Sequence, residues 1–212
     1  MTKSSGFFIT FEGPEGAGKS SQVARLSNYL TERGRECVLT REPGGTGLAE
    51  IIRQVVKSHC SVEKLHDETE LLLIEAARAQ HVREKILPAL KDDKIVICDR
   101  FSDSTKAYQG GARKLPADVI DYLNDFASDG RKPDLTILLD LPPETGFARI
   151  SSRESEGYDR FENEKLEFHR QVREAFLAAA AAEPERFCII DATLSEIEIA
   201  EKIRQVVDVA LF

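Results

Sequence analysis

Short runs of β-branched and aromatic residues alternate along the chain with longer segments whose apolar residues recur every three to four positions. The short runs predict strands at 7–12, 37–40, 95–98, 135–139 and 187–190. The longer segments predict helices at 19–32, 48–57, 67–90, 116–127, 144–152, 162–182 and 195–210. Strands that alternate with helices form βα units, so this order predicts a doubly wound α/β fold with a five-stranded parallel sheet and helices on both faces.

No linker rich in glycine, proline or serine divides the chain, and no internal repeat is present. A length of 212 residues suits one large domain, so we expect residues 1–212 to form a single domain. The segment 151–159 (SSRESEGYD) is polar, contains a glycine and lies between two predicted helices. It is typical of a mobile surface loop.

The balance of charge excludes some classes of partner. The formal net charge is −8, which argues against nucleic-acid binding as the main function. The N-terminus lacks the apolar region of a signal peptide, and no stretch approaches 18 apolar residues, so we expect a cytoplasmic protein without membrane spans. Four cysteines without metal-ligand spacing are expected to be plain buried thiols in a reducing compartment: Cys37, Cys60, Cys98 and Cys188.

The segment 13–20 (GPEGAGKS) matches the phosphate-binding pattern G-x-x-x-x-G-K-[ST], and it lies between a predicted strand and a predicted helix. Glycines let backbone N–H groups converge on phosphate oxygens, and the start of the helix adds its dipole. We expect Lys19 to reach the β and γ phosphates of a nucleotide. The residues predicted to bind the nucleotide are Gly13, Glu15, Gly16, Ala17, Gly18, Lys19, Ser20 and Ser21.

Asp99 follows the third predicted strand, where a carboxylate faces the ligand crevice of a parallel sheet. Together with the hydroxyl of Ser20 it is the predicted site for Mg²⁺, a cation that prefers oxygen ligands. The alternative for Asp99 is an ordinary helix-capping or turn aspartate.

A phosphate-binding loop leaves kinases, GTPases and motor ATPases open. The guanine-reading motif N-K-x-D does not occur, which argues against a GTPase. Four arginines lie in or just after the strand ends and helices that flank the crevice: Arg41, Arg53, Arg78 and Arg100. On an acidic protein this placement favours a pocket for an anionic small molecule, although each arginine alone could be a surface ion-pair partner.

Five motifs resemble those of the bacterial thymidylate kinases: REPGGT (41–46), AARAQ (76–80), DRF (99–101), AYQGG (107–111) and DRFE (159–162). The resemblance extends from residue 7 to about residue 191. It implies a P-loop NTPase fold of the nucleoside monophosphate kinase type, with a short lid at about 149–160. It also implies transfer of a phosphoryl group from Mg-ATP to dTMP, giving dTDP for dTTP synthesis, in a homodimer packed through helices.

The resemblance assigns a dTMP site to Glu15, Arg41, Glu42, Pro43, Arg53, Ile74, Arg78, Arg100, Ser104, Tyr108 and Gln109. In this assignment Arg53 and Arg100 hold the 5′-phosphate, and Arg41 and Glu42 shape that end of the site. The thymine edge is read by Arg78, Ser104 and Gln109. Tyr108 packs against the deoxyribose where a 2′-hydroxyl would lie, and Glu15 meets the 3′-hydroxyl.

Ile74 departs from the family pattern, because family members often carry phenylalanine there for stacking on thymine. An aliphatic side chain can still supply apolar contact, and the alternative is a core position on the predicted helix 67–90.

No general base is required, because the second pKa of a phosphate monoester is near 6 and the acceptor oxygen is already ionised. Catalysis then consists of positioning and charge neutralisation. The expected catalytic residues are Lys19, Arg100 and three lid arginines, Arg149, Arg153 and Arg160, of which Arg153 is the expected principal one. Four histidines are expected to be structural or exposed, without a carboxylate partner: His59, His66, His81 and His169.

Two alternatives remain at this point. One is a related nucleotide kinase with another acceptor, and the other is a nucleotide-binding module without transfer activity. The joint presence of Lys19, Ser20, Asp99 and the lid arginines argues against a module that only binds.

Overall fold

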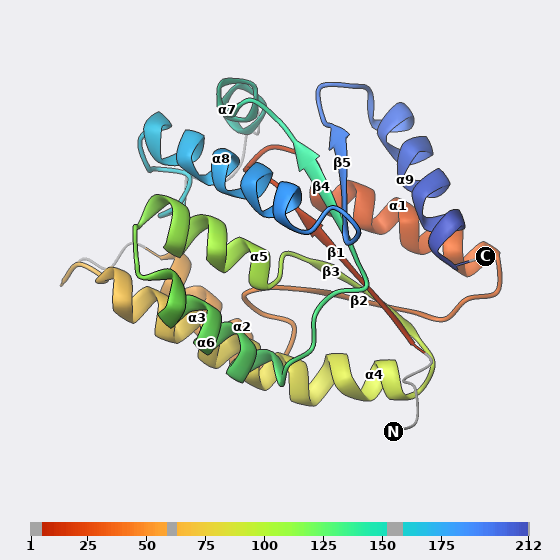
Figure 1. Ribbon diagram of the computed structural model, residues 1–212, viewed down its shortest axis with the longest axis horizontal. Helices are drawn as coiled ribbons and strands as arrows, with labels where there is room; N and C mark the ends of the chain where they lie inside the picture. Colours follow the sequence, from red (N-terminus) through yellow and green to blue (C-terminus); the bar gives the residue numbers. More distant parts are fainter. Residues whose placement is uncertain (1–5, 59–62, 152–158, 212) are drawn as a thin grey trace.

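The computed structural model describes residues 6–58, 63–151 and 159–211 and contains a five-stranded parallel sheet with the order β2-β3-β1-β4-β5 (Figure 1). The strands are β1 (Phe7–Glu12), β2 (Cys37–Arg41), β3 (Ile95–Asp99), β4 (Leu135–Asp140) and β5 (Phe187–Asp191). Four of them extend one polar residue beyond the predicted apolar run. These polar residues lie at the carboxyl edge of the sheet, which is the edge where doubly wound folds bind ligands.

Helices cover both faces of this sheet, as predicted. The elements that match or lie within the predicted helices are α1 (Lys19–Glu32), α2 (Gly47–Lys57), α3 (Asp67–His81), α4 (Leu87–Lys91), α6 (Ala117–Ser128), α7 (Pro143–Ser151), α8 (Leu166–Ala182) and α9 (Glu196–Leu211). Among the described residues, none of these helices is long and apolar enough to cross a membrane.

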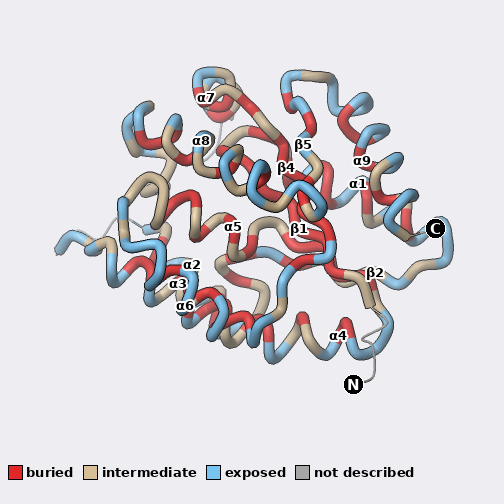
Figure 2. Tube along the Cα trace, viewed as in Figure 1, coloured by how far each residue is buried: buried red, intermediate tan, exposed pale blue. Residues whose placement is uncertain are grey.

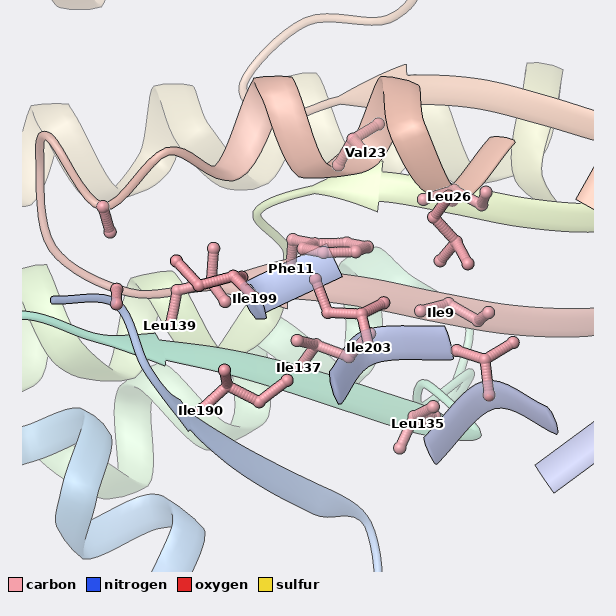
Figure 3. Packing of buried hydrophobic residues seen from close by; sticks show 14 of the residues in the cluster. Ile9, Phe11, Val23, Leu26, Leu135, Ile137, Leu139, Ile190, Ile199 and Ile203 are labelled. Carbon is pink, nitrogen blue, oxygen red and sulfur yellow. The ribbon is translucent and has the colours of Figure 1, made fainter. Parts of the chain in front are cut away.

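Alternation along the strands supplies two separate apolar layers. Ile9 and Phe11 point to one face and pack with residues of α1 and α9, and Figure 3 shows this layer from close by. Phe8 points to the other face and packs with Val82 and Ile86. Because both faces are covered, the central strands β1 and β4 are buried along almost their whole length (Figure 2).

The predicted helix 67–90 is helical throughout but not uniform. A π-helical segment, η1 (Val82–Ile86), separates α3 from α4. Pro88 lies in the first turn of α4. Proline has no N–H to donate and its ring crowds the preceding turn, so the wider π turn accommodates it without ending the helix.

A helical segment at 102–112 was not predicted. It consists of α5 (Ser102–Thr105) and the π-helical η2 (Lys106–Ala112). Consecutive glycines are poor helix formers, so the sequence favours a loop here. Packing overrides this preference: a Cβ on Gly111 would lie 2.5 Å from the Cβ of Ala175 on α8, so glycine allows the close approach of these two helices.

The predicted helix 162–182 begins later than expected, at Leu166. Before it, the side chain of Asp159 accepts hydrogen bonds from the backbone N–H groups of Phe161 and Glu162 at 2.9 and 3.0 Å. Aspartate forms such local turns readily, and this one sets the segment 159–162 beside the carboxyl edge of the sheet.

Candidate active site

The loop between β1 and α1 depends on its glycines. Gly13, Gly16 and Gly18 have φ angles of 136°, 75° and 85°, a region that L side chains rarely adopt. Space is also limited, because a Cβ on Gly13 would lie 2.3 Å from the carbonyl O of Leu139. The loop therefore holds the curved backbone that a phosphate-binding loop requires, and it leads directly into α1.

Lys19 is the first residue of α1, and its side chain reaches back across the loop. Its Nζ donates hydrogen bonds to the carbonyl oxygens of Gly13 and Pro14 at 3.0 and 2.8 Å. Burial, with repulsion from Arg100, lowers the pKa of Lys19 to about 8. The ammonium group thus lies at the cavity wall at a position where phosphate could replace these carbonyl contacts.

Ser20 and Asp99 come together as the sequence predicted. The Ser20 Oγ donates a hydrogen bond to the Asp99 Oδ2 at 2.7 Å, across 79 residues of sequence. The contact follows from β1 and β3 being neighbours in the sheet. A hydroxyl and a carboxylate oxygen side by side beside a phosphate-binding loop fit a Mg²⁺ ion that completes its coordination with phosphate and water.

A cavity of about 300 Å³ lies beside these groups. One wall is formed by the phosphate-binding loop and the start of α1, and another by Arg41, Pro43, Arg53 and Arg100. Asp159, Phe161 and Glu162 form a third wall. The volume is at the lower end of the ~300–1,000 Å³ typical of ligand pockets.

Three arginines line this cavity: Arg41, Arg53 and Arg100. Arg41 pairs with Glu50 at 2.9 Å, and the Arg53 Nη1 donates to the carbonyl O of Pro43 at 2.8 Å. Burial, together with repulsion from Arg41, lowers the pKa of Arg53. Several guanidinium groups that line one cavity are typical of a site that binds an anion.

Glu15 balances part of this charge. Burial alone would raise the pKa of Glu15, but Arg100 and Lys19 lower it to about 2. Its Oε1 accepts hydrogen bonds from the Arg100 Nη2 at 2.8 Å and from the Tyr108 hydroxyl at 3.1 Å. Arg100 also lies over the ring of Tyr108, so these three predicted site residues form one contact group on the cavity wall.

Three residues predicted to lie at the base, one through apolar contact and two through reading its edge, lie behind the cavity wall. Ile74, Arg78 and Gln109 are 7%, 1% and 1% exposed, and none of them lines the cavity. The Arg78 Nε donates to Glu42 at 2.8 Å, and its Nη1 donates to Glu75 at 2.6 Å.

Ser104 likewise engages protein groups. Its hydroxyl donates to the Glu12 Oε2 at 2.6 Å and accepts from the Arg100 Nη1 at 3.1 Å. The Glu12 Oε1 accepts from the backbone N–H of Phe101 at 2.7 Å. Glu12 therefore supports the backbone around Arg100, which has a left-handed φ of 71°.

The expectation that the histidines lack carboxylate partners is wrong for His81. Its Nδ1 lies 2.9 Å from the Glu42 Oε1, and its Nε2 lies 2.6 Å from the Thr40 Oγ1. His81 is fully buried, and these contacts join the last residue of α3 to the end of β2 and the residue after it. His66 is exposed, His169 is buried with no bonded partner at Nε2, and His59 lies outside the described residues.

Two of the three lid arginines lie in the described part of the chain. The Arg149 Nη1 approaches the carbonyl O of Gly16 at 3.4 Å. The Arg160 Nε donates to the carbonyl O of Val56 at 2.9 Å, and its Nη2 bonds with Glu70. Arg153, the expected principal residue, lies outside the described residues.

Sequence reasoning missed several residues at this site: Glu12, Lys57, Asp159, Phe161 and Glu162. Lys57 lines the cavity and pairs with Asp159 at 2.6 Å. The DRFE motif could have identified three of these residues, since it contributed to the family resemblance. Glu12 carried the same signal as Asp99, a carboxylate at the end of a buried strand.

The expectation of buried thiols is confirmed for Cys98, whereas Cys37 and Cys188 are only partly buried. Cys37, Cys98 and Cys188 are free, and Cys60 lies outside the described residues.

Comparison with known proteins gives consistent matches. A family model described as thymidylate kinase matches residues 11–203. The chain is 50% identical over 198 residues to a thymidylate kinase of Desulfosudis oleivorans, covering 91% of this chain and 92% of that protein. It is 54% identical to one of Pseudomonas fluorescens, covering 88% of each chain. The crystal structure of a thymidylate kinase from Ehrlichia chaffeensis matches with a TM-score of 0.76 at 35% identity, covering 95% of this chain and 98% of that one.

Proposed function

The chain belongs to the thymidylate kinase family, and we propose on this premise how its site selects and uses its substrates. The enzyme phosphorylates dTMP in nucleotide biosynthesis and uses ATP. Residues 1–212 act in this proposal as one nucleoside monophosphate kinase domain in the cytoplasm, with a lid at about 149–160.

The arginine wall of the cavity is the observation that carries the dTMP assignment. Arg53 and Arg100 bind the 5′-phosphate, because their positive charges converge beside the cavity and the repulsion from Arg41 is relieved by an anion. Arg41, Glu42 and Pro43 shape this end of the pocket. The phosphate of dTMP then faces the phosphate-binding loop, which is the arrangement that phosphoryl transfer between two nucleotides requires.

Glu15 and Tyr108 lie where the sugar of dTMP would follow its phosphate. Their mutual contact and their place on the cavity wall support the proposal that Glu15 meets the 3′-hydroxyl and that Tyr108 fills the space of a 2′-hydroxyl. Ile74, Arg78, Ser104 and Gln109 then form the layer behind, on the side where the base would lie.

The donor side uses the phosphate-binding loop. Backbone N–H groups of residues 13–18 and Lys19 hold the phosphates of ATP, and Ser20 and Ser21 begin the helix whose dipole favours them. Mg²⁺ held by Ser20 and Asp99 would draw charge from the phosphate oxygens.

Catalysis needs no general base, because the phosphate of dTMP is already ionised at neutral pH. Arg100 holds the attacking phosphate, Lys19 neutralises the donor phosphates, and the two nucleotides are fixed in line. Arg149 supplies a further cation beside Gly16, and Arg160 anchors the end of the lid. We retain Arg153 as the proposed principal lid arginine.

A test of the dTMP assignment compares two arginines. Arg53→Ala removes charge-assisted hydrogen bonds worth ~1.5–3 kcal/mol each, so the dissociation constant for dTMP should rise about 10- to 100-fold in calorimetry. Arg25→Ala is the matched control, because Arg25 pairs with Glu196 at 3.0 Å and does not line the cavity. Equal binding by both variants would contradict the assignment.

An ADP-release assay with dTMP, dUMP, dCMP and dGMP then tests whether dTMP is the preferred acceptor.

A homodimer is supported by an apolar face over α2, α3 and α6, which lie side by side (Figure 1). Its exposed apolar residues are Leu48, Ile51, Val55, Leu72, Val119, Tyr122 and Phe126. Exposed apolar side chains gathered on neighbouring helices are typical of an interface, and we assign this face to a second copy of the chain. Phe126→Glu should convert a dimer to a monomer in sedimentation equilibrium, whereas Ile197→Glu, at an equally exposed position on α9, should not. A wild-type monomer would reject the assignment.

A further inference from the structure

Glu70 is a fully buried carboxylate on α3 that no step of the proposed reaction uses. Its oxygens accept hydrogen bonds from three side chains that belong to three different parts of the chain. The Gln109 Nε2 donates to Oε1 at 2.5 Å, the Arg113 Nη2 donates to Oε2 at 3.3 Å, and the Arg160 Nη2 also bonds with Oε2. Glu70 therefore joins the proposed base-reading amide to the residue that ends the lid.

Burial of a carboxylate costs several kcal/mol unless charged and polar partners surround it. Here two guanidinium groups and one amide supply that compensation. Arg113 is shared with Glu164 at 2.6 Å, so it is held from two sides. The cluster is fully satisfied by these partners, and its member Gln109 directly follows Tyr108, which lines the cavity.

We propose that Glu70 is a positioning residue that holds the Gln109 amide in a single orientation and thereby sets the preference for thymine over cytosine. The proposal rests on the proposed function, in which Gln109 meets the base edge.

The partners of Glu70 determine which atom of the Gln109 amide faces it. A carboxylate between two guanidinium groups accepts hydrogen bonds and donates none, so the amide must turn its Nε2 toward Glu70. The amide oxygen of Gln109, its Oε1, then faces away from Glu70. No residue in the described part of the chain donates a hydrogen bond to this Gln109 oxygen. An acceptor that no described protein group occupies suits the N3–H of thymine, whereas the N3 of cytosine is itself an acceptor and would be repelled.

Arg160 connects Glu70, which orients the Gln109 amide, to the carboxyl-terminal end of the proposed lid. The Arg160 backbone N–H donates to the carbonyl O of Lys57 at 3.2 Å, and its side chain bonds with both Val56 and Glu70. The same carboxylate thus holds the Gln109 amide and the segment that carries Asp159 and Phe161 to the cavity.

The decisive variant is Glu70→Gln, which keeps the shape of the side chain and lets it donate as well as accept. The Gln109 amide is then free to flip, so the ratio of kcat/KM for dTMP to kcat/KM for dCMP should fall at least about tenfold. Glu164→Gln is the matched control, because Glu164 pairs with the same Arg113 but does not contact Gln109; its ratio should stay at the wild-type value. If Glu70→Gln lowers both kcat/KM values equally, Glu70 is merely structural and the proposal is overturned.

Two further measurements complete the test. Gln109→Leu should abolish most of the preference for thymine; if it does not, Gln109 does not read the base, and both this proposal and that part of the proposed function fail. If Gln109→Leu loses the preference and Glu70→Gln retains it, only the role of Glu70 fails. A measurement on the wild-type protein does not depend on whether any variant folds. In NMR, the side-chain NH₂ of Gln109 should exchange slowly with solvent, and rapid exchange would overturn the proposal that Glu70 holds this amide in one orientation.

Discussion

Replacing Gly146 with alanine tests how closely α7 packs on the phosphate-binding loop. A Cβ on Gly146 would lie 2.4 Å from the carbonyl O of Glu15, and a Cβ on Gly16 would lie 2.5 Å from the carbonyl O of Gly146. Ordinary van der Waals contact begins at 3.4 Å, so α7 would have to withdraw by about 1 Å. The obstacle is backbone, which cannot rotate away as a side chain can.

Two effects of opposite sign decide the stability of Gly146→Ala. Alanine favours a helix over glycine by ~1 kcal/mol, so helix propensity alone predicts a more stable protein. Overpacking against a rigid neighbour costs ~1–3 kcal/mol, so the structure predicts a net loss of about 1 kcal/mol. For a chain of this length such a loss lowers Tm by ~2–4 °C.

Gly146→Ala should also lower turnover, and by a larger factor than its small effect on the free energy of unfolding suggests. Arg149 lies on the same helix and approaches Gly16, so its guanidinium would move with α7. A misplacement of about 1 Å in a catalytic group can lower turnover ~10²-fold, and we expect kcat to fall toward that extent while dTMP affinity changes little.

The measurements are thermal unfolding and steady-state kinetics, with Gly47→Ala as the matched control. Gly47 begins α2, and a Cβ there would meet nothing within 4 Å, so this variant should be as stable as the wild type or more so, with unchanged kcat. If Gly146→Ala also melts at or above the wild-type temperature and retains full kcat, the close contact between α7 and the loop does not constrain the site and the reasoning is refuted.

Three other outcomes are expected. The pKa of Lys19 is lowered to about 8, so the ammonium is charged below that pH and neutral above it; kcat/KM for ATP should decline above about pH 8, and a profile flat to pH 10 would contradict this. Tyr108→Ala should narrow the preference for dTMP over its ribonucleotide counterpart in ADP-release assays, and an unchanged preference would reject the proposed sugar contact. Ile74→Phe should lower the free energy of unfolding by ~1–3 kcal/mol in denaturant titrations without tightening dTMP binding, because Ile74 is buried off the cavity wall; tighter binding without destabilisation would place it at the base.

The sequence by itself determined the architecture and the position of the phosphate-binding loop. Strand alternation and helical periodicity are local signals, so five strands and the flanking helices could be read directly, and the parallel direction of the strands followed from the βα units. The phosphate-binding loop is also local, because its glycines, Lys19 and Ser20 act through a continuous stretch of backbone. Contact between Asp99 and Ser20 was predictable because Asp99 ends β3, and Ser20 lies in the first turn of α1, directly after the loop that follows the neighbouring strand β1.

Only the tertiary structure decided which buried charges meet. The contacts of His81 with Glu42 and of Glu70 with Gln109 each join residues 39 positions apart, and no periodicity or spacing encodes such a pair. The helical course of 102–112 likewise depends on α8, whose approach makes Gly111 favourable where intrinsic propensity predicts a loop. Local preferences are worth about 1 kcal/mol per residue, whereas burying an unpaired charge costs several, so packing and charge pairing prevail wherever the two conflict.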